Sequence, residues 1–345
     1  MKLGIVVGYA GKHLQLPMDL IKEAEGLGYS SCWTAEAYGS DAVTTAAWIL
    51  ANTSKINVGT AIMQMSARAP TMAAMTALSL QHLSSGRFIV GIGPSGPQVV
   101  EGWYGDTYRK PLTRMREYIE IMRKVWEREG PLEYDGFHYQ MPYRGEDASG
   151  LGKPLKSILH SEGPIQLYTA TLKPKALELS SELCNGFFPV WMNPERFDLF
   201  QEPIEKGLAK VPGKTLADYD VAPFVTAVMG DDVEQCRMPV KAMMALYIGG
   251  MGARGKNFYN TYATQLGYGD AAREIQDLYL DGKKMEAAAK VPDQLVDDVA
   301  LVGPADRIKD NLQRWTEAGK KHQVGSMLIA GGQPEVLRLI AETVL

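Results

Sequence analysis

Cysteine and histidine are scarce in this chain, and neither is spaced to hold a metal. The cysteines Cys32, Cys184 and Cys236 stand far apart with no CxxC pair, which argues against a zinc ribbon or a disulfide framework. We expect them to be buried free thiols. The five histidines form no HxH or HExxH pattern, so the sequence predicts no metal site.

Long apolar runs and an excess of charge are also missing. The opening stretch MKLGIVVGYAG is apolar only as far as Gly8, too short for a signal-peptide core or a membrane span. We therefore expect a cytoplasmic protein without membrane insertion. The 36 basic and 40 acidic side chains leave a net charge of −4, which argues against a nucleic-acid partner.

Short apolar runs that end in glycine or polar residues are present instead, and they recur along the 345 residues. Such runs are typical of buried strands, and helical patterns lie between them. Eight alternating units predict an α/β protein folded as a (β/α)8 TIM barrel in a single domain over 1–345, with a doubly wound open sheet as the alternative. The expected strands are Leu3–Val7, Ser31–Thr34, Ile56–Ile62, Phe88–Ile92, Ile165–Ala170, Gly186–Val190, Val221–Val228 and Val324–Ile329.

Two segments interrupt this alternation and are predicted to be insertions. Residues 130–162, after the fourth strand, are rich in Gly, Pro and Tyr and contain a possible hairpin at LEYDGFHYQM. Residues 249–303, between strands seven and eight, hold two short helical patterns.

Glycines follow two of the expected strands at their carboxyl ends, where a βα barrel builds its site. Gly8 follows the first strand, and the fourth runs into Gly93, Pro94, Ser95 and Gly96. Their backbone N–H groups and the Ser95 hydroxyl suit an anion, but a plain tight turn explains the same residues. The prolines at 94 and 97 fit a dinucleotide fingerprint poorly.

Polar side chains follow the second and third expected strands. Glu36 is a candidate general acid or base, with Tyr38 in support, although a carboxylate here can instead cap the next helix, as Asp41 is expected to do. Gln64 can donate to and accept from a ligand. Arg68 either binds an anion or is an ordinary surface charge.

A family resemblance connects these motifs. The stretches TAEAYGSDA, VGTAIMQMSARAPT, RFIVGIGPSGPQVVEGWYG, KPLTRMREYIEIMRKVW and VPDQLVDDVALVGPADRIKDNL together resemble the bacterial luciferase-like superfamily, in particular its coenzyme F420-dependent oxidoreductase branch. The resemblance covers nearly the whole chain. It implies a βα barrel with insertions, a redox cofactor in the mouth of the barrel, and a homodimer.

The resemblance also implies which residues meet the cofactor. A non-prolyl cis peptide at Ala61–Ile62 would support the tricyclic ring, with Glu36 and Ala37 beside it. The Gly93–Gly96 turn would approach the ribityl phosphate. A second cofactor loop would comprise Thr169, Ala170, Thr171 and Leu172.

Two departures separate this chain from the sugar-phosphate dehydrogenases of that branch. Those enzymes have a histidine where this chain has Ala37 and a glutamate near the position of Gly96, so their chemistry is not carried over.

The resulting prediction is an oxidoreductase that uses coenzyme F420 to transfer a hydride to or from an organic carbonyl, alcohol or activated double bond. Glu36, Tyr38 and Gln64 are the candidate catalytic residues, and the aromatic insertions suggest a hydrophobic small-molecule substrate. The alternatives are an FMN-dependent luciferase-like monooxygenase and a non-catalytic flavin-binding protein.

Overall fold

The computed structural model describes residues 1–8, 11–171 and 173–345, which divide into two compact units. The first unit contains Met1–Pro189, Asp198–Pro223 and His322–Leu328. The second contains Val190–Phe197, Phe224–Lys321 and Ile329–Leu345. A single domain over 1–345 stays a prediction.

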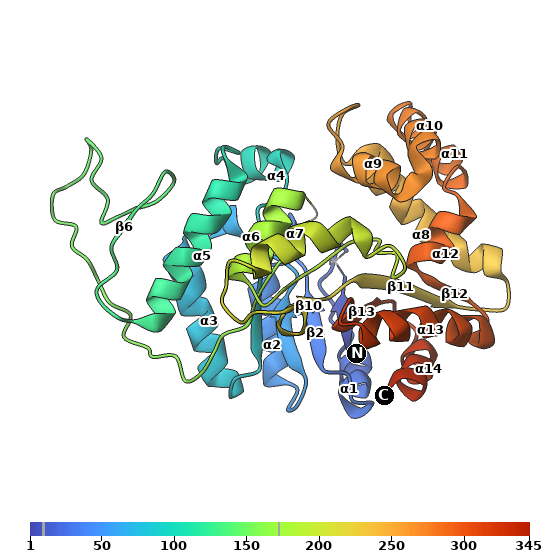
Figure 1. The fold of residues 1–345 in the computed structure, drawn as a ribbon, viewed down its shortest axis with the longest axis horizontal. Helices are drawn as coiled ribbons and strands as arrows, with labels where there is room; N and C mark the ends of the chain where they lie inside the picture. The colour runs from blue at the N-terminus through green and yellow to red at the C-terminus, as the bar shows by residue number, and fades with distance from the viewer. Residues whose placement is uncertain (9–10, 172) are drawn as a thin grey trace. The chain divides into compact units, whose positions relative to one another are not determined.

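A parallel sheet forms the centre of the first unit (Figure 1). Its strands follow the spatial order β10-β9-β8-β5-β3-β2-β1-β13, and the short strand β4 pairs with β5. The expected strands over Leu3–Val7, Ser31–Thr34 and Phe88–Ile92 are confirmed within a residue. The bounds are β1 Lys2–Val7, β2 Ser31–Thr34, β3 Asn57–Thr60, β4 Met63–Gln64, β5 Phe88–Gly93, β8 Leu167–Thr169, β9 Gly186–Phe187, β10 Asp220–Val221 and β13 Ser326–Ala330.

This sheet curls back on itself through the chain around the start of β13. The N–H of Lys2 on β1 donates to the carbonyl of Gly325 (2.8 Å). The N–H of Gly325 in turn donates to the carbonyl of Val221 on β10 (3.0 Å), and Leu328 N–H donates to Pro223 (3.0 Å). The predicted α/β class and the parallel arrangement are thus confirmed.

Helices of the first unit begin where the sequence supplies a start signal. Asp41 caps α2 by accepting from the N–H groups of Val43 (3.3 Å) and Thr44 (2.7 Å), as predicted. Prolines stand in the first turn of α3, α5 and α6. The helices are α1 Met18–Gly26, α2 Ala42–Ala51, α3 Pro70–Ser84, α4 Pro97–Gly102, α5 Pro111–Glu127, α6 Pro174–Leu183 and α7 Asp198–Leu208, with 3-10 turns at Met65–Ala67 and Leu216–Asp218.

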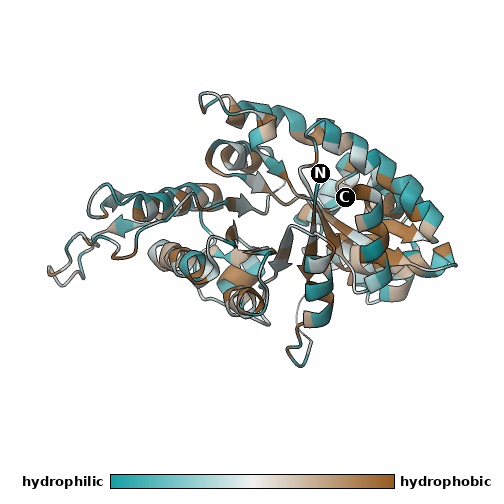
Figure 2. Cartoon of the chain, turned by 90° about the horizontal axis from the view of Figure 1, so that it is seen from below, coloured by the Kyte–Doolittle hydropathy of each residue, from teal (hydrophilic) through white to brown (hydrophobic). Residues whose placement is uncertain are grey.

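Helix α5 carries a stripe of apolar residues and packs against α3 and α6. Met115, Ile119 and Met122 on this stripe are buried. Figure 2 shows many helices brown along one side and teal along the other, the pattern of elements that bury one face.

The segment 130–162 contains the hairpin that the sequence suggested. Strands β6 (Tyr134–Asp135) and β7 (Gln140–Met141) pair antiparallel. The buried carboxylate of Glu117 on α5 holds the turn between them by accepting from the N–H groups of Phe137 (2.7 Å), His138 (2.8 Å) and Tyr139 (3.2 Å). That this segment is an insertion in the barrel stays a prediction.

The second unit pairs two parallel strands, β11 (Phe224–Met229) and β12 (Leu301–Gly303), and most of its other elements are helices. Gln333 joins β11 to the chain before α14 by accepting from Met229 N–H (2.8 Å) and donating to its carbonyl (2.9 Å). The helices are α8 Val233–Ala245, α9 Phe258–Ala263, α10 Gly269–Leu280, α11 Lys284–Ala289, α12 Asp293–Val299, α13 Ala305–Lys320 and α14 Pro334–Val344, with π-helical turns at Leu246–Gly250 and Thr264–Tyr268.

Two sequence predictions about strands were wrong. The single strand expected over Val221–Val228 is two strands, because Pro223 has no N–H to donate and separates β10 from β11. Residues 301–303 were assigned to the 249–303 insertion, yet they form β12.

Among the described residues, no helix combines the length and the apolar character that crossing a membrane requires.

Candidate functional site

The carboxyl ends of β3, β5 and β8 bring together three residues that the resemblance assigned to a cofactor site. An ideal Cβ built on Gly93 would lie 3.0 Å from the Ile62 side chain and 3.7 Å from Ala170 Cβ. Ala170 N–H donates to the Ile92 carbonyl (3.2 Å). Ile62, Gly93 and Ala170 therefore form one small apolar cluster, here called the cradle, in which the Ile62 side chain packs over Gly93. The peptide bond between Ala61 and Ile62 is cis, as the resemblance implied.

A close approach of β3 and β5 shapes the chain beneath the cradle. Thr60 Oγ1 donates to the carbonyl of Gly91 (2.8 Å) and accepts from its N–H (3.0 Å). A Cβ on Gly91 would lie 1.8 Å from the Thr60 carbonyl oxygen, so only glycine fits at this position. The Ala61 N–H donates to the Thr34 carbonyl on β2 (2.6 Å), which fixes the start of the cis bond.

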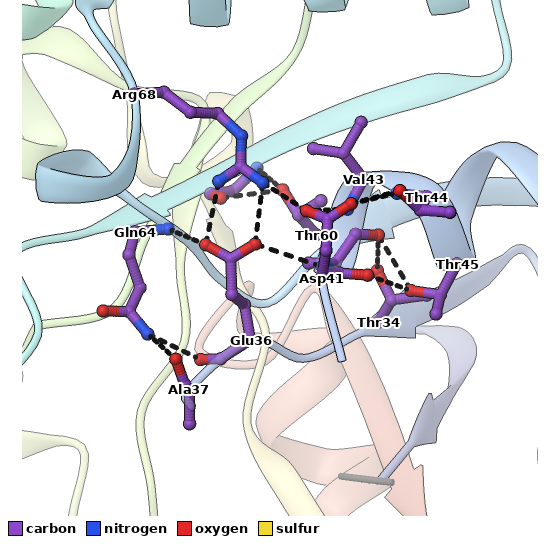
Figure 3. Close-up of polar contacts among 12 residues, drawn as sticks. Thr34, Glu36, Ala37, Asp41, Val43, Thr44, Thr45, Thr60, Gln64 and Arg68 are labelled. Atoms are coloured by element: carbon purple, nitrogen blue, oxygen red, sulfur yellow. Dashed lines mark hydrogen bonds and ion pairs between the residues drawn. The ribbon is translucent and has the colours of Figure 1, made fainter. Parts of the chain in front are cut away.

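Glu36 lies beside the cradle with both carboxylate oxygens occupied (Figure 3). Its Oε1 accepts from the Gln64 N–H (3.0 Å) and from Arg68 Nη1 (2.8 Å). Its Oε2 accepts from the Ala42 N–H (3.1 Å) and from Arg68 Nη2 (2.9 Å). The carboxylate thus ties the turn after β2 to the loop after β4, and Arg68 holds it with two parallel hydrogen bonds.

Arg68 also contacts the carboxylate of Asp41, so one guanidinium serves two acids. Burial opposes the charged form of Arg68, but hydrogen bonding to Glu36 outweighs it and raises the pKa of the guanidinium. Burial likewise opposes the Asp41 charge, and hydrogen bonds from Thr44 with the Arg68 charge hold the pKa of Asp41 below its usual value. The alternative that Arg68 is an ordinary surface charge was wrong, since its side chain is only 18% exposed.

The amide of Gln64 has a fixed orientation. Its Nε2 donates to the carbonyl oxygens of Glu36 (3.2 Å) and Ala37 (2.8 Å), which only the NH2 side of the amide can do. Its Oε1 is consequently directed away from them, as Figure 3 shows. This oxygen is buried and has no hydrogen-bond partner among the described residues. A buried acceptor without a partner is costly, so this oxygen is suited to accept a hydrogen bond from a bound molecule.

The turn after β5 places Pro94, Ser95 and Gly96 half-buried between the strand and α4. Ser95 adopts a left-handed backbone, with φ of 60°. Such a residue in a short turn is one way to direct successive N–H groups to one side.

The remaining candidates from the sequence have varied surroundings. Gly8 lines a cavity at the carboxyl ends of β1 and β2 together with Thr34, Ala35 and Ser40. The Thr169 hydroxyl is buried and shares a hydrogen bond with Ser180 Oγ (2.5 Å). Thr171 is half-buried. Leu172 lies outside the described residues.

Trp103 and Tyr104, which belong to the aromatic residues that suggested a hydrophobic substrate from the sequence, lie near this site. The ring of Tyr38 has its centroid 6.4 Å from that of Trp103, which follows α4. Burial and the Glu36 charge raise the pKa of Tyr104. Their separation from Glu36 by about seventy positions hid this proximity from any local pattern.

Comparison with known proteins identifies the family. The family model described as luciferase-like monooxygenase matches residues 3–322. The chain belongs to the luciferase-like family. Similar proteins include the "Putative coenzyme F420-dependent oxidoreductase" of Mycobacterium tuberculosis, 41% identical over 348 residues, covering 100% of this chain and 99% of that protein. A 5,10-methylenetetrahydromethanopterin reductase of Archaeoglobus fulgidus is 26% identical, covering 100% and 99%.

A solved structure shares the fold over nearly the whole chain. The coenzyme F420 dependent tetrahydromethanopterin reductase from Methanopyrus kandleri matches with a TM-score of 0.79 at 22% identity, covering 99% of this chain and 98% of that one. This likeness shows that the luciferase-like fold is shared.

Proposed function

We propose that this luciferase-like protein is an F420-dependent oxidoreductase that transfers a hydride between the deazaflavin and an organic carbonyl, alcohol or activated double bond. The observation that carries the proposal is the cradle, whose Gly93 pairs with Gln64 between β5 and β4, together with the unpartnered Gln64 Oε1. The full-length similarity to a protein named for coenzyme F420 supports it. The curled sheet is then the (β/α)8 barrel, with this site at the carboxyl ends of its strands.

The residues present suit a flat tricyclic ring that has both apolar faces and polar edges. Ile62 and Ala170 offer half-buried apolar side chains against which a ring can lie, with Gly93 buried beneath the Ile62 side chain. Gln64 Oε1 offers an acceptor to a ring N–H and would gain its missing partner. Ser95 and its neighbours would hold the ribityl phosphate. When bound, the deazaflavin supplies the carbon that gives or takes the hydride.

The protein's own part is to position these groups. Because four donors already occupy the Glu36 carboxylate, we assign Glu36 a positioning role instead of proton transfer. It fixes the backbone of Gln64 and, through Arg68, the loop after the cis bond. A proton for the substrate oxygen would come from a hydroxyl at this edge, with Tyr38 the candidate from the sequence. A cytoplasmic homodimer remains part of the proposal.

Binding measurements separate this function from FMN-dependent oxygen chemistry. The purified protein is titrated with oxidised coenzyme F420 and with FMN, and the same titrations are made with Ser95→Asp, which places a negative charge in the phosphate turn. We expect preference for F420, with at least about tenfold weaker binding in the variant. Preference for FMN would favour a monooxygenase. No binding of either would contradict the site itself.

A further inference from the structure

We propose that Tyr38 and Trp103 form an aromatic platform that binds the apolar, ring-bearing part of the substrate. This inference rests on the proposed function, because it places the substrate of that reaction beside the proposed cofactor site. The substrate class it assigns is cyclic ketones, enones and alcohols with an apolar ring.

Exposure of two large aromatic side chains at one place is the first observation. Tyr38 is 68% exposed and Trp103 is 65% exposed, although their rings are neighbours. A large aromatic side chain buries roughly 150–250 Å² when it is fully covered, and about two-thirds of that area is still exposed on each ring. Adjacent exposed rings beside a candidate site are typical of ligand-binding surfaces.

Hydrogen bonds hold the backbone that carries the rings of Tyr38 and Trp103. Tyr38 follows Ala37, whose carbonyl accepts from Gln64 Nε2 (2.8 Å). The N–H of Trp103 donates to the Val99 carbonyl in α4 (2.9 Å). Helix α4 starts directly after the turn proposed for the cofactor phosphate. The platform is therefore built on the same two loops that frame the cofactor site.

The geometry of the pair determines how a ring can bind. The centroids are 6.4 Å apart and the ring planes are inclined by 55°, so no flat ring fits between them, since a sandwich needs parallel planes about 7 Å apart. A substrate must lie across the two rings. Such a contact rewards apolar surface and brings no positive charge to a phosphate.

The positive charge of Arg68 does not change this preference for apolar ligands. Arg68 is already paired with Glu36 and Asp41, so its charge is neutralised within the protein. An anionic sugar phosphate would find no free charge on Arg68. It also has no apolar surface to place against the platform.

Equilibrium dialysis against a cyclic and a polar probe tests the platform. Each variant is first saturated with oxidised coenzyme F420, and its affinity for F420 is recorded. The complex is then dialysed against menadione, an apolar bicyclic quinone, or against glucose 6-phosphate. The variants are Trp103→Ala, Tyr38→Ala and the control Trp48→Ala, which removes a tryptophan that is 60% exposed on α2.

We expect menadione to bind the wild type and Trp48→Ala equally, and to bind Trp103→Ala and Tyr38→Ala about 3- to 10-fold more weakly. Trp103→Phe should recover most of the loss, because it restores a ring. F420 affinity should stay within about twofold in all of them. Equal menadione binding by every variant, no menadione binding by the wild type, or preference for glucose 6-phosphate would overturn the platform. Failure of the wild type to bind F420 would instead contradict the proposed function.

Discussion

Replacing Arg68 with methionine tests whether the Glu36–Arg68 pair organises the site. The substitution keeps much of the side-chain volume but leaves the Glu36 carboxylate buried, with its side chain 5% exposed and only two backbone N–H donors. Arg68 Nη1 lies 2.8 Å from Glu36 Oε1, so the charge centres are about 4 Å apart, an attraction of about 4 kcal/mol at an effective dielectric constant near 20. Breaking a buried pair by removing one partner costs a similar 3–5 kcal/mol. We therefore expect the free energy of unfolding to fall by about 3–4 kcal/mol.

The assay is urea unfolding followed by circular dichroism, with two comparisons. Arg273→Ala removes an arginine that is 74% exposed and paired with Asp270, and it should cost less than about 1 kcal/mol. The double variant Glu36→Gln with Arg68→Met leaves no buried charge at Glu36, so it should recover roughly 2 kcal/mol of the loss. If Arg68→Met were no more destabilised than Arg273→Ala, the pair would not hold the site together.

Three further predictions concern the cradle, the unpartnered Gln64 Oε1 and the Asp41 cap of α2. Gly93→Val places a Cβ only 3.0 Å from the Ile62 side chain and adds two methyl groups to it, so it should weaken F420 binding at least about tenfold in a titration; unchanged affinity would mean that the ring lies elsewhere. Gln64→Leu removes the unpartnered acceptor, so F420 should bind about 3- to 10-fold more weakly, and equal binding would contradict its role. Because the folded-state pKa of Asp41 is lowered, its charge stabilises the fold above the unfolded pKa near 4, and this contribution disappears as the pH falls through the lower folded value. The wild type should therefore lose its stability advantage over Asp41→Asn below about pH 4 in thermal melts, and an advantage that does not change with pH would refute this assignment.

Three strands of the first unit, β1, β2 and β5, could be predicted within a residue because each is a short, mostly apolar run bounded by glycine or polar residues. Ser31–Thr34 shows this most simply, since all four residues are buried. Pro223 was the available signal for the break between β10 and β11, because proline cannot donate within a strand. β12 was missed because three residues, Leu301–Gly303, are too few to show an alternating pattern.

The site was only partly accessible from the sequence. Glu36, Gln64 and Gly93 could be identified as candidates because each lies at the carboxyl end of an expected strand, and parallel strands place these ends at one edge of the sheet. The partner of Glu36 is Arg68, 32 positions away, and no local pattern links them. Such a contact depends on tertiary packing. The proximity of Tyr38 to Trp103 was hidden for the same reason.

The central claim, hydride transfer with a deazaflavin, is tested most directly by the fate of reduced coenzyme F420 on the protein. The complex is mixed anaerobically with a panel of cyclic enones and ketones, and the return of the oxidised deazaflavin absorbance is followed. The same complex is then exposed to air without an organic acceptor. We predict oxidation that requires the organic acceptor and proceeds without oxygen. Oxidation by air alone, or no oxidation with any acceptor while reduced FMN is turned over, would contradict the claim.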